Sequence, residues 1–367
     1  MRFFENIKLE NFRNFNNYYL SFNQKCNVFY GLNGSGKTNI LEAISLFEKG
    51  RGIRKDRYEN MINKNQNSNF FKVISTFVSA NNKIDLELKS ELKDNRYKKI
   101  IKVNKSISIE NYNYFENLFS LIWFLPEMER IFLQSPSVRR NFLDRLVYNT
   151  DKSYVKLLRK YNNRIIERKN LLYKEKPDAE WINKIEFDIV DLGILIYKKR
   201  EEYINSLNNE LKNLNLTKEN FFKIKLNIKD SFINKIDNKD NLEDMYFKQL
   251  SHNRNEDMIS GGCKIGPHRS DILGRDLIKN FSLDLFSTGQ QKTFILQIIL
   301  AHCNILIKSF NLQPIVFFDE VCSHLDDKNR AILLELIETL NVQIFLTGTD
   351  NNSFSFLSTN ANYCCIE

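Results

Sequence analysis

The sequence predicts an α/β fold whose two halves are separated along the chain by a long helical insertion. Three observations support this prediction. An apolar, β-branched and aromatic run at 26–30 passes through a glycine-rich turn into a helical pattern at 39–46. Glycine almost vanishes between 121 and 241, where apolar residues recur at helical spacing. Finally, 315–320 is an apolar run that ends in two carboxylates. The length of 367 residues suits about two domains.

Composition indicates a protein that works in the cytoplasm. Hydrophobic residues make up 42% of the chain, yet no stretch approaches the roughly 20 unbroken apolar residues of a membrane span. The N-terminus shows no secretion signal, and the six cysteines are scattered without metal-ligand spacing. The net charge of +9 permits an anionic partner such as nucleic acid. It does not establish one, because abundant Asn, Lys, Ile and Phe also result from an AT-rich coding sequence.

The turn that follows the first apolar run has the spacing of a phosphate-binding P-loop. It consists of Gly31, Leu32, Asn33, Gly34, Ser35, Gly36, Lys37 and Thr38. The glycines let successive backbone N–H groups point at phosphate oxygens, and the following helix adds the positive end of its dipole. Lys37 is expected to reach the β- and γ-phosphates, and the Thr38 hydroxyl to bind Mg²⁺. The sequence therefore predicts a nucleoside triphosphate and Mg²⁺ as cofactors, and the resemblance described below specifies the nucleotide as ATP.

Short strands are predicted on either side of this turn. At the N-terminus, 7–9 and 18–22 read as strands that flank Arg13, which lies between two aromatic residues. After the P-loop, 71–79 and 84–88 have the alternating or clustered apolar residues of strands. The basic segment 96–105 is expected to pair with the strand before it. Its lysines could contact DNA phosphates, although a solvated hairpin face explains them more simply.

The helical insertion is predicted to form a lobe of its own, at 121–250, within a discontinuous head made of 1–120 and 251–367. Helical spacing is clearest at 138–148, 154–175 and 179–214. In the last of these, one apolar face is expected to contain Ile182, Ile185, Ile189, Leu192, Leu195 and Ile196. The pattern is too irregular for a sustained heptad coiled coil.

The two carboxylates that end the apolar run at 315–320 are weak evidence alone, but together with the upstream P-loop they indicate an ATPase site. Asp319 is expected to hold Mg²⁺, directly or through water, opposite Thr38, and Glu320 to act as the general base that polarises the attacking water. The segment 287–291, Ser-Thr-Gly-Gln-Gln, opens a further helix. It resembles the signature loop of ABC-type ATPases, in which Ser and Gly contact the γ-phosphate held by a second subunit. Taken alone, it also reads as an ordinary capped helix start.

The order of these motifs fits an ABC-type ATPase head interrupted by a helical arm, and their wording resembles the RecF family of bacterial recombination-repair ATPases. The likeness covers nearly the whole chain. It is carried by Phe-Arg-Asn-Phe at 12–15, the P-loop at 31–39, Pro-Ser-Val-Arg-Arg-Asn-Phe-Leu-Asp at 136–144, Gly-Pro-His-Arg-Ser-Asp at 266–271, Ser-Thr-Gly-Gln-Gln-Lys at 287–292, Asp-Glu at 319–320 with His-Leu-Asp at 324–326, and Thr-Gly-Thr-Asp at 347–350.

The resemblance implies a cytoplasmic, weakly active, DNA-dependent ATPase that dimerises around ATP and binds DNA, single-stranded or as gapped or junction duplex. It implies partner mediator proteins that load recombinase, and no membrane. Carried over by position, Arg13 would contact the nucleotide, and Ser287 and Gly289 would close the ATP site of the other subunit. Asp326 would lie at the dimer seam, and Asp350 would occupy the switch position. A glutamine-loop residue is not assigned, although Gln134 lies in a plausible place.

Three other classes fit parts of the pattern. A transporter ATPase subunit would normally carry a histidine switch and would lack the Arg-Arg-x-Phe-Leu-Asp segment. An SMC-type chromosome-organising protein needs hundreds of heptad residues between the halves of its head. An ABC-like head joined to a nuclease would carry an additional carboxylate-rich domain after Asp350, and none follows.

Overall fold

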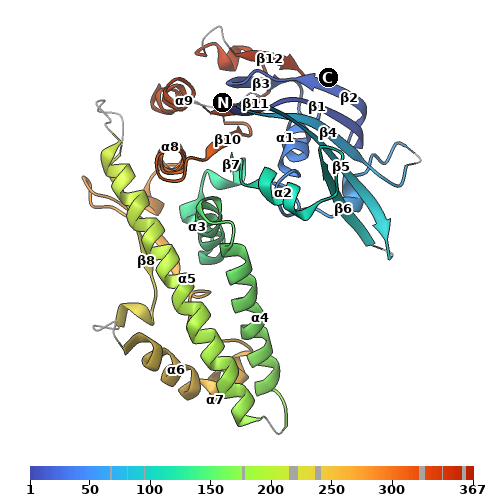
Figure 1. Ribbon diagram of the computed structural model, residues 1–367. Helices are drawn as coiled ribbons and strands as arrows, with labels where there is room; N and C mark the ends of the chain where they lie inside the picture. Colours follow the sequence, from blue (N-terminus) through green and yellow to red (C-terminus); the bar gives the residue numbers. More distant parts are fainter. Residues whose placement is uncertain are drawn as a thin grey trace. The chain divides into compact units, whose positions relative to one another are not determined.

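The computed structural model describes residues 1–66, 68–80, 82–94, 96–175, 178–214, 222–235, 241–321, 327–340, 342–357 and 361–367. These residues form two compact units, which are described separately (Figure 1). The first comprises Met1–Glu129 and Ile295–Glu367, and the second Arg130–Phe294. The predicted α/β head interrupted by a helical lobe is confirmed.

A five-stranded parallel sheet forms the centre of the first unit. Its strands lie in the order β12 (Asn362–Cys365), β3 (Cys26–Tyr30), β11 (Gln343–Gly348), β10 (Gln313–Phe318) and β7 (Phe119–Phe124). Every neighbouring pair is parallel. The carboxyl ends of all five strands therefore meet at one edge, which is where α/β proteins bind their ligands.

The second sheet of this unit is antiparallel. Its order is β2 (Phe15–Ser21), β1 (Arg2–Phe12), β4 (Lys72–Ser79), β5 (Asn82–Lys93) and β6 (Arg96–Val103). The basic segment pairs with the preceding strand as predicted, with Leu86 opposite Val103 and Lys93 opposite Arg96. Its lysines Lys99 and Lys102 bond to protein groups rather than standing free.

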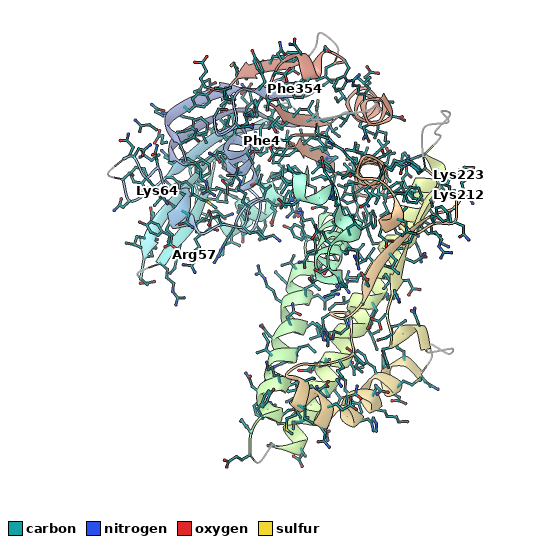
Figure 2. The ribbon with its side chains drawn as sticks, turned by 180° about the vertical axis from the view of Figure 1, so that it is seen from behind. Phe4, Arg57, Lys64, Lys212, Lys223 and Phe354 are labelled. Atoms are coloured by element: carbon teal, nitrogen blue, oxygen red, sulfur yellow. The ribbon has the colours of Figure 1, made fainter. Side chains whose placement is uncertain are left out.

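One apolar core joins the two sheets. Phe4 of β1, which Figure 2 labels, is fully buried in it. Its ring lies against those of Phe47, Phe77 and Phe119, with ring centroids 5.1–5.8 Å apart. The side-chain amide of Gln343 on β11 adds a polar link within this core. It donates to the Phe4 carbonyl at 2.8 Å and accepts from the Phe4 N–H at 2.9 Å. A fully buried amide is stable here because its bonds replace those it lost to water.

Four helices accompany the sheets of the first unit: α1 (Lys37–Ser45), α2 (Ile109–Glu116), α9 (Asp327–Thr339) and most of α8 (Thr288–Phe310). The C-terminal end of α1 is held by Lys99 of β6. The ammonium of Lys99 donates to the carbonyls of Leu46, Glu48 and Gly50 at 2.8–3.0 Å. Cations at a helix C-terminus offset the negative end of its dipole, so β6 helps to fix the helix that follows the P-loop.

The unit boundaries differ from the head and lobe boundaries expected from the sequence, at 120/121 and 250/251. The first falls at 129/130 because β7 pairs with β10 over Phe119–Phe124. The second falls at 294/295 because β9 (Asp271–Asp276) pairs with β8 (Ile224–Lys229) in a two-stranded ribbon of the second unit. Residues 251–294 thus lie with the helical lobe.

Long helices dominate the second unit, which contains α3 (Pro136–Thr150), α4 (Tyr154–Leu172), α5 (Ala179–Asn213), α6 (Leu242–His252) and α7 (Arg254–Ser260) beside the ribbon. The predicted apolar face of α5 is buried at Ile182, Ile185, Ile189 and Ile196. Leu195 is an exception, with 48% of its surface exposed, because it falls at the edge of the stripe.

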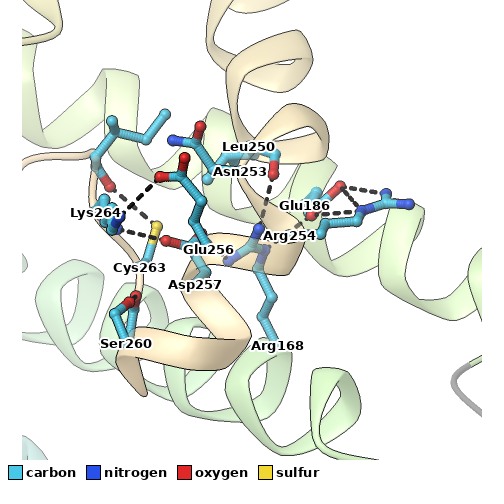
Figure 3. Close-up of polar contacts among 12 residues, drawn as sticks. Arg168, Glu186, Leu250, Asn253, Arg254, Glu256, Asp257, Ser260, Cys263 and Lys264 are labelled. Carbon is cyan, nitrogen blue, oxygen red and sulfur yellow. Dashed lines mark hydrogen bonds and ion pairs between the residues drawn. The ribbon is translucent and has the colours of Figure 1, made fainter.

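A buried ion-pair cluster ties three of these helices together (Figure 3). The guanidinium of Arg168 on α4 donates to Glu186 on α5 at 2.8 Å, to Asp257 on α7 at 2.7 Å and to the Leu250 carbonyl at 2.8 Å. Arg168, Glu186 and Asp257 are each no more than 2% exposed. Because every charge in this dry interior has an opposite partner, the cluster fixes the spacing of the helices.

Within the described residues, α8 is the one helix long and apolar enough to cross a membrane by length and composition. Its apolar residues are interrupted by polar ones such as Gln297 and His302, and 72% of its most apolar window is buried inside the protein. Core helices meet the same criteria. The described cysteines are all unpaired.

Candidate nucleotide-binding site

The P-loop turn connects β3 at the centre of the parallel sheet to α1. Its backbone adopts positive φ angles at Gly31, Gly34 and Gly36. At Gly36 a Cβ atom would lie 2.6 Å from the Phe15 ring, so glycine is required there for space as well as conformation. Gly36 also offers no side chain to cap α1. The first N–H groups of the helix are therefore available to an anion.

Lys37 folds back over the loop. Its ammonium donates to the carbonyls of Gly31 at 2.7 Å and Leu32 at 2.8 Å, and the residue is only 5% exposed. An ammonium has three N–H donors, so one is left for a phosphate oxygen. The Ser35 hydroxyl in the same loop is buried, and none of the residues that the structure describes forms a hydrogen bond with it. An orphaned donor beside helix N–H groups fits a polyphosphate ligand.

The expected metal ligands meet at the carboxyl edge of the sheet. The Thr38 hydroxyl donates to Asp319, at 2.9 and 3.0 Å from its two carboxylate oxygens. The Thr347 hydroxyl at the end of β11 donates to Asp319 Oδ1 at 2.7 Å. Hydroxyl and carboxylate oxygens are the ligands that Mg²⁺ takes alongside phosphates and water. Among the described residues, no group of three or more His, Cys, Asp or Glu side chains could hold a metal ion. The remaining ligands of a Mg²⁺ ion at Thr38 and Asp319 would therefore be phosphate oxygens and water.

Glu320 follows directly and is exposed. Its backbone is left-handed, with φ of 53°, and its N–H donates to the Thr347 hydroxyl at 2.9 Å. A non-glycine residue in this conformation is strained by about 1–3 kcal/mol, and such strain clusters at functional sites. Asp319 is held in turn through its N–H, which donates to the Phe124 carbonyl at 2.9 Å. The two acids thus differ in environment: Asp319 is buried and accepts from Thr38, whereas Glu320 is exposed.

Arg13 is engaged differently from the direct nucleotide contact expected of it. Its guanidinium pairs with both carboxylate oxygens of Glu42 at 2.7 and 2.8 Å, pairs with Asp56 at 3.0 Å and donates to the Asn60 carbonyl at 2.9 Å. Burial alone would lower the pKa of Arg13, but the bonds and charge of Glu42 raise it. At most one of its five N–H donors remains, so nucleotide contact by Arg13 stays a prediction.

Ser287 and Gly289 lie in the second unit, at the start of α8. The Ser287 N–H donates to the Gln290 side-chain carbonyl at 3.1 Å, and the Gln290 N–H donates back to the Ser287 hydroxyl at 3.5 Å, which is the reciprocal arrangement of a capping box. Gly289 has open space where a Cβ atom would be. Arg130 also donates to the Thr288 hydroxyl, at 3.3 Å. The helix start is thus ordered by its own residues, and Gly289 is exposed there.

Asp350 follows β11 and is exposed. Its carboxylate accepts from the Ser353 N–H at 3.0 Å and from the Ser353 hydroxyl at 2.8 Å. These bonds lower the pKa of Asp350, so the side chain is an anion at neutral pH. Its switch role stays a prediction. Asp326, expected at a dimer seam, lies outside the described residues.

Sequence reasoning missed three polar residues that shape this site. Asn14 donates to the Ser35 carbonyl at 2.8 Å and accepts from Asn39 at 2.8 Å, which ties the first hairpin to the P-loop. Thr347 bridges Asp319 and Glu320. Glu42 is fully buried on α1 as the partner of Arg13. Glu42 could have been noticed in the sequence, because it is an acidic residue within the otherwise apolar run Ile-Leu-Glu-Ala-Ile.

Comparisons with known proteins agree with this architecture. Residues 3–364 match the RecF/RecN/SMC N terminal domain family. A "DNA replication and repair protein RecF" from Rickettsia felis is 34% identical over 95% of this chain and 93% of its own length. Another, from Rickettsia conorii, is 35% identical over 98% of both. A structure described as "the recombination mediator protein RecF-ATPrS in RecFOR pathway" has a TM-score of 0.83 at 26% identity, covering 99% of this chain and 95% of that one.

Replacing Lys37 with Met should weaken ATP binding by about 10- to 150-fold, because a charge-assisted hydrogen bond contributes roughly 1.5–3 kcal/mol. Equilibrium titration with a fluorescent ATP analogue measures this. The control is Lys64→Met, which removes an exposed lysine from the same unit. Unchanged affinity in the Lys37 variant would show that the loop does not bind the triphosphate.

Proposed function

The chain belongs to the RecF family, and from that premise we propose that it is an ATP-controlled DNA-binding protein of recombinational repair and replication-fork maintenance. The observation that carries the proposal is the contact between the P-loop and the acidic strand end, Thr38 to Asp319 at 2.9 Å, next to a buried Lys37. This is the arrangement of an ATPase that binds a triphosphate with Mg²⁺. The RecF structures described with ATP support the same ligand.

Each site residue then has a role in hydrolysis. The loop N–H groups and Lys37 bind the phosphates, and Thr38 with Asp319 holds Mg²⁺, which would neutralise charge on the phosphate oxygens. Glu320, which is exposed, would accept a proton from the attacking water. Arg13 orients the P-loop helix through Glu42, with nucleotide contact if that ion pair opens. Asp350 acts as the switch that senses the γ-phosphate.

We propose that the site is completed by a second copy of the chain. The exposed residues Ser287 and Gly289 would contact the γ-phosphate bound by the partner, in a two-fold arrangement where each copy serves the other. ATP would then bind the dimer better than the monomer and shift the equilibrium toward it. Slow, DNA-dependent hydrolysis would loosen the dimer and release DNA.

The proposed partners are DNA, single-stranded or as gapped or junction duplex, and mediator proteins that help to load recombinase. Support comes from the relatives, which are described as DNA replication and repair proteins and, in the solved structure, as a recombination mediator in the RecFOR pathway. We place this work in the cytoplasm.

The decisive variant is Ser287→Arg, which should still bind ATP as a monomer but lose ATP-dependent dimerisation and hydrolysis together. An arginine at the helix start would meet the partner's loop and Lys37 with added bulk and like charge. Analytical sedimentation of wild type and variant, each with ATP or ADP and with a gapped duplex, measures dimer content and DNA retention. Lys264→Arg is the matched control, because Lys264 is exposed in the same unit.

Equal dimer content in wild type and variant, with either nucleotide, would contradict the ATP-assembled dimer. Wild-type protein that sediments apart from DNA under every condition would contradict the DNA-binding role and favour a transporter-like ATPase subunit.

A further inference from the structure

Two sequence motifs that the nucleotide site does not use lie against each other in the second unit. One is Arg-Arg-x-Phe-Leu-Asp at 139–144 on α3, and the other is Gly-Pro-His-Arg-Ser-Asp at 266–271. Arg139 donates to both carboxylate oxygens of Asp271, at 2.7 and 2.6 Å. Arg140, next along the helix, donates to the Ser270 carbonyl at 2.6 Å. Segments more than a hundred residues apart thus form one polar junction.

Asp144, the second acidic residue of the two motifs, is also engaged in an ion pair. Asp144 accepts two bonds from Arg200 of α5, at 2.8 and 2.9 Å, and Arg200 donates to the Pro267 carbonyl at 2.5 Å. Arg200 is 2% exposed. A carboxylate held by both prongs of a guanidinium has little capacity left for another cation. Asp271 and Asp144 therefore neutralise Arg139 and Arg200.

The turn itself is rigidly packed. Gly266 has a φ of 120°, and a Cβ atom there would lie 2.3 Å from the hydroxyls of Tyr161 and Tyr246. His268 bonds the Tyr161 hydroxyl at 2.8 Å and the Cys263 carbonyl at 2.9 Å. Burial, together with three nearby arginines, lowers the pKa of His268, so its ring is neutral at pH 7. A turn fixed on both sides holds the residue after His268 in a defined place.

Two guanidinium groups are left without a counter-ion. Arg140 has the Ser270 carbonyl as its one hydrogen-bond partner, and within the described residues no carboxylate reaches it at ion-pair distance. Arg269 is exposed and has no side-chain partner in the part of the chain that the structure describes. Burial lowers the pKa of Arg140, and the charges of Arg200 and Arg269 add to this effect, while Asp144 and Asp271 act in the opposite direction.

We propose that Arg140 and Arg269 form a binding site for backbone phosphates of DNA. The inference rests on the proposed function and extends it by naming the residues. Clustered like charges cost free energy unless an anion offsets them, and arginine binds phosphate through a planar, two-pronged set of donors. The positions are preorganised, Arg140 by Ser270 and Arg269 by the packed turn. Phosphate contacts carry no sequence information, which suits a protein that acts at gaps of any sequence.

The test is the salt dependence of DNA binding by the full chain with ATP. A fluorescein-labelled gapped duplex serves as probe, and affinity is measured by anisotropy between 50 and 300 mM NaCl. Each phosphate contact contributes a slope of about −0.9 to log K against log[salt]. Arg140→Gln with Arg269→Gln should flatten the slope by about 1.8 and weaken binding about 30-fold near 0.15 M salt. Arg269→Gln alone should flatten it by about 0.9.

The control pair is Arg159→Gln with Arg275→Gln, which removes the same charge from exposed positions of the same unit. It should leave the slope unchanged. Equal flattening in both pairs, or none in either, overturns the site. The Arg269 side chain has no hydrogen-bond or ion-pair partner among the described residues, so replacing it should not affect folding. The Arg269→Gln variant therefore stays informative even if the double variant unfolds. Wild-type protein that fails to bind the probe at all would instead contradict the proposed DNA-binding function.

Discussion

Replacing Glu320 with Gln should slow ATP hydrolysis by about 10²- to 10⁴-fold while leaving ATP bound. The amide keeps the size of the carboxylate but cannot accept a proton from water. Glu320 follows Asp319 yet is exposed, whereas Asp319 is engaged by Thr38 and Thr347. The two acids can therefore be tested separately, and the base role is predicted for Glu320.

Single-turnover hydrolysis and equilibrium ATP binding, measured on the same samples, distinguish chemistry from affinity. Glu110→Gln is the control, because Glu110 is an exposed acid in the same unit, on α2. The variant should also accumulate as an ATP-bound dimer, since the step that releases the pair is blocked. Turnover equal to that of the parent would remove Glu320 from the base role.

Replacing Arg168 with Met should lower the free energy of unfolding by about 3–5 kcal/mol, because it leaves the buried carboxylate of Asp257 without a cation. Glu186 keeps its ion pair with Arg254. Glu186 is fully buried and Asp257 is 2% exposed, and both carboxylates bond the Arg168 guanidinium (Figure 3). Methionine fills much of the space but offers no N–H donors. The loss is larger than the pair's net contribution to stability, since an unpaired carboxylate in a dry interior is the main cost.

Arg164→Met is the matched control, one helical turn earlier on α4. Its side chain is 41% exposed and pairs with Glu167 and Asp188, so the loss should stay below about 1 kcal/mol. Urea unfolding followed by circular dichroism compares the variants. A second variant, Arg168→Met with Asp257→Asn, should recover part of the loss, because it removes the carboxylate charge that lost its cation. Equal stability of the Arg164 and Arg168 variants would refute the account.

The elements that the sequence predicted well are those whose pattern has one interpretation. Cys26–Tyr30 is a strand with the predicted bounds, and α5 ends within one residue of its predicted end. Strand β7 was missed at the start of the predicted lobe, because Phe119–Phe124 is a continuous apolar run that buried strands and buried helix segments share. The β8–β9 ribbon pairs residues about fifty positions apart, which no local pattern reveals.

The site followed the same rule. Lys37, Thr38 and Asp319 could be brought together in advance because carboxyl ends of parallel strands share one edge. The partners of those residues could not. The aromatic residues beside Arg13 in the sequence do not predict its ion pair with Glu42. The bonds that Thr347 makes to Asp319 and Glu320 depend on the register of β11 beside β10. Side-chain pairing between distant segments is fixed by packing, which spacing along a chain does not encode.

The strand order of the parallel sheet has a consequence for biosynthesis. Strand β3 leaves the ribosome early, yet both strands that flank it, β11 and β12, are made more than three hundred residues later. At roughly 5–20 residues per second, the P-loop strand waits on the order of 15–60 s before either neighbour exists. During that interval its apolar faces and backbone edges are open to wrong partners. Nascent chains stalled inside the helical lobe should therefore be aggregation-prone and dependent on chaperones, although the P-loop itself has already been synthesised.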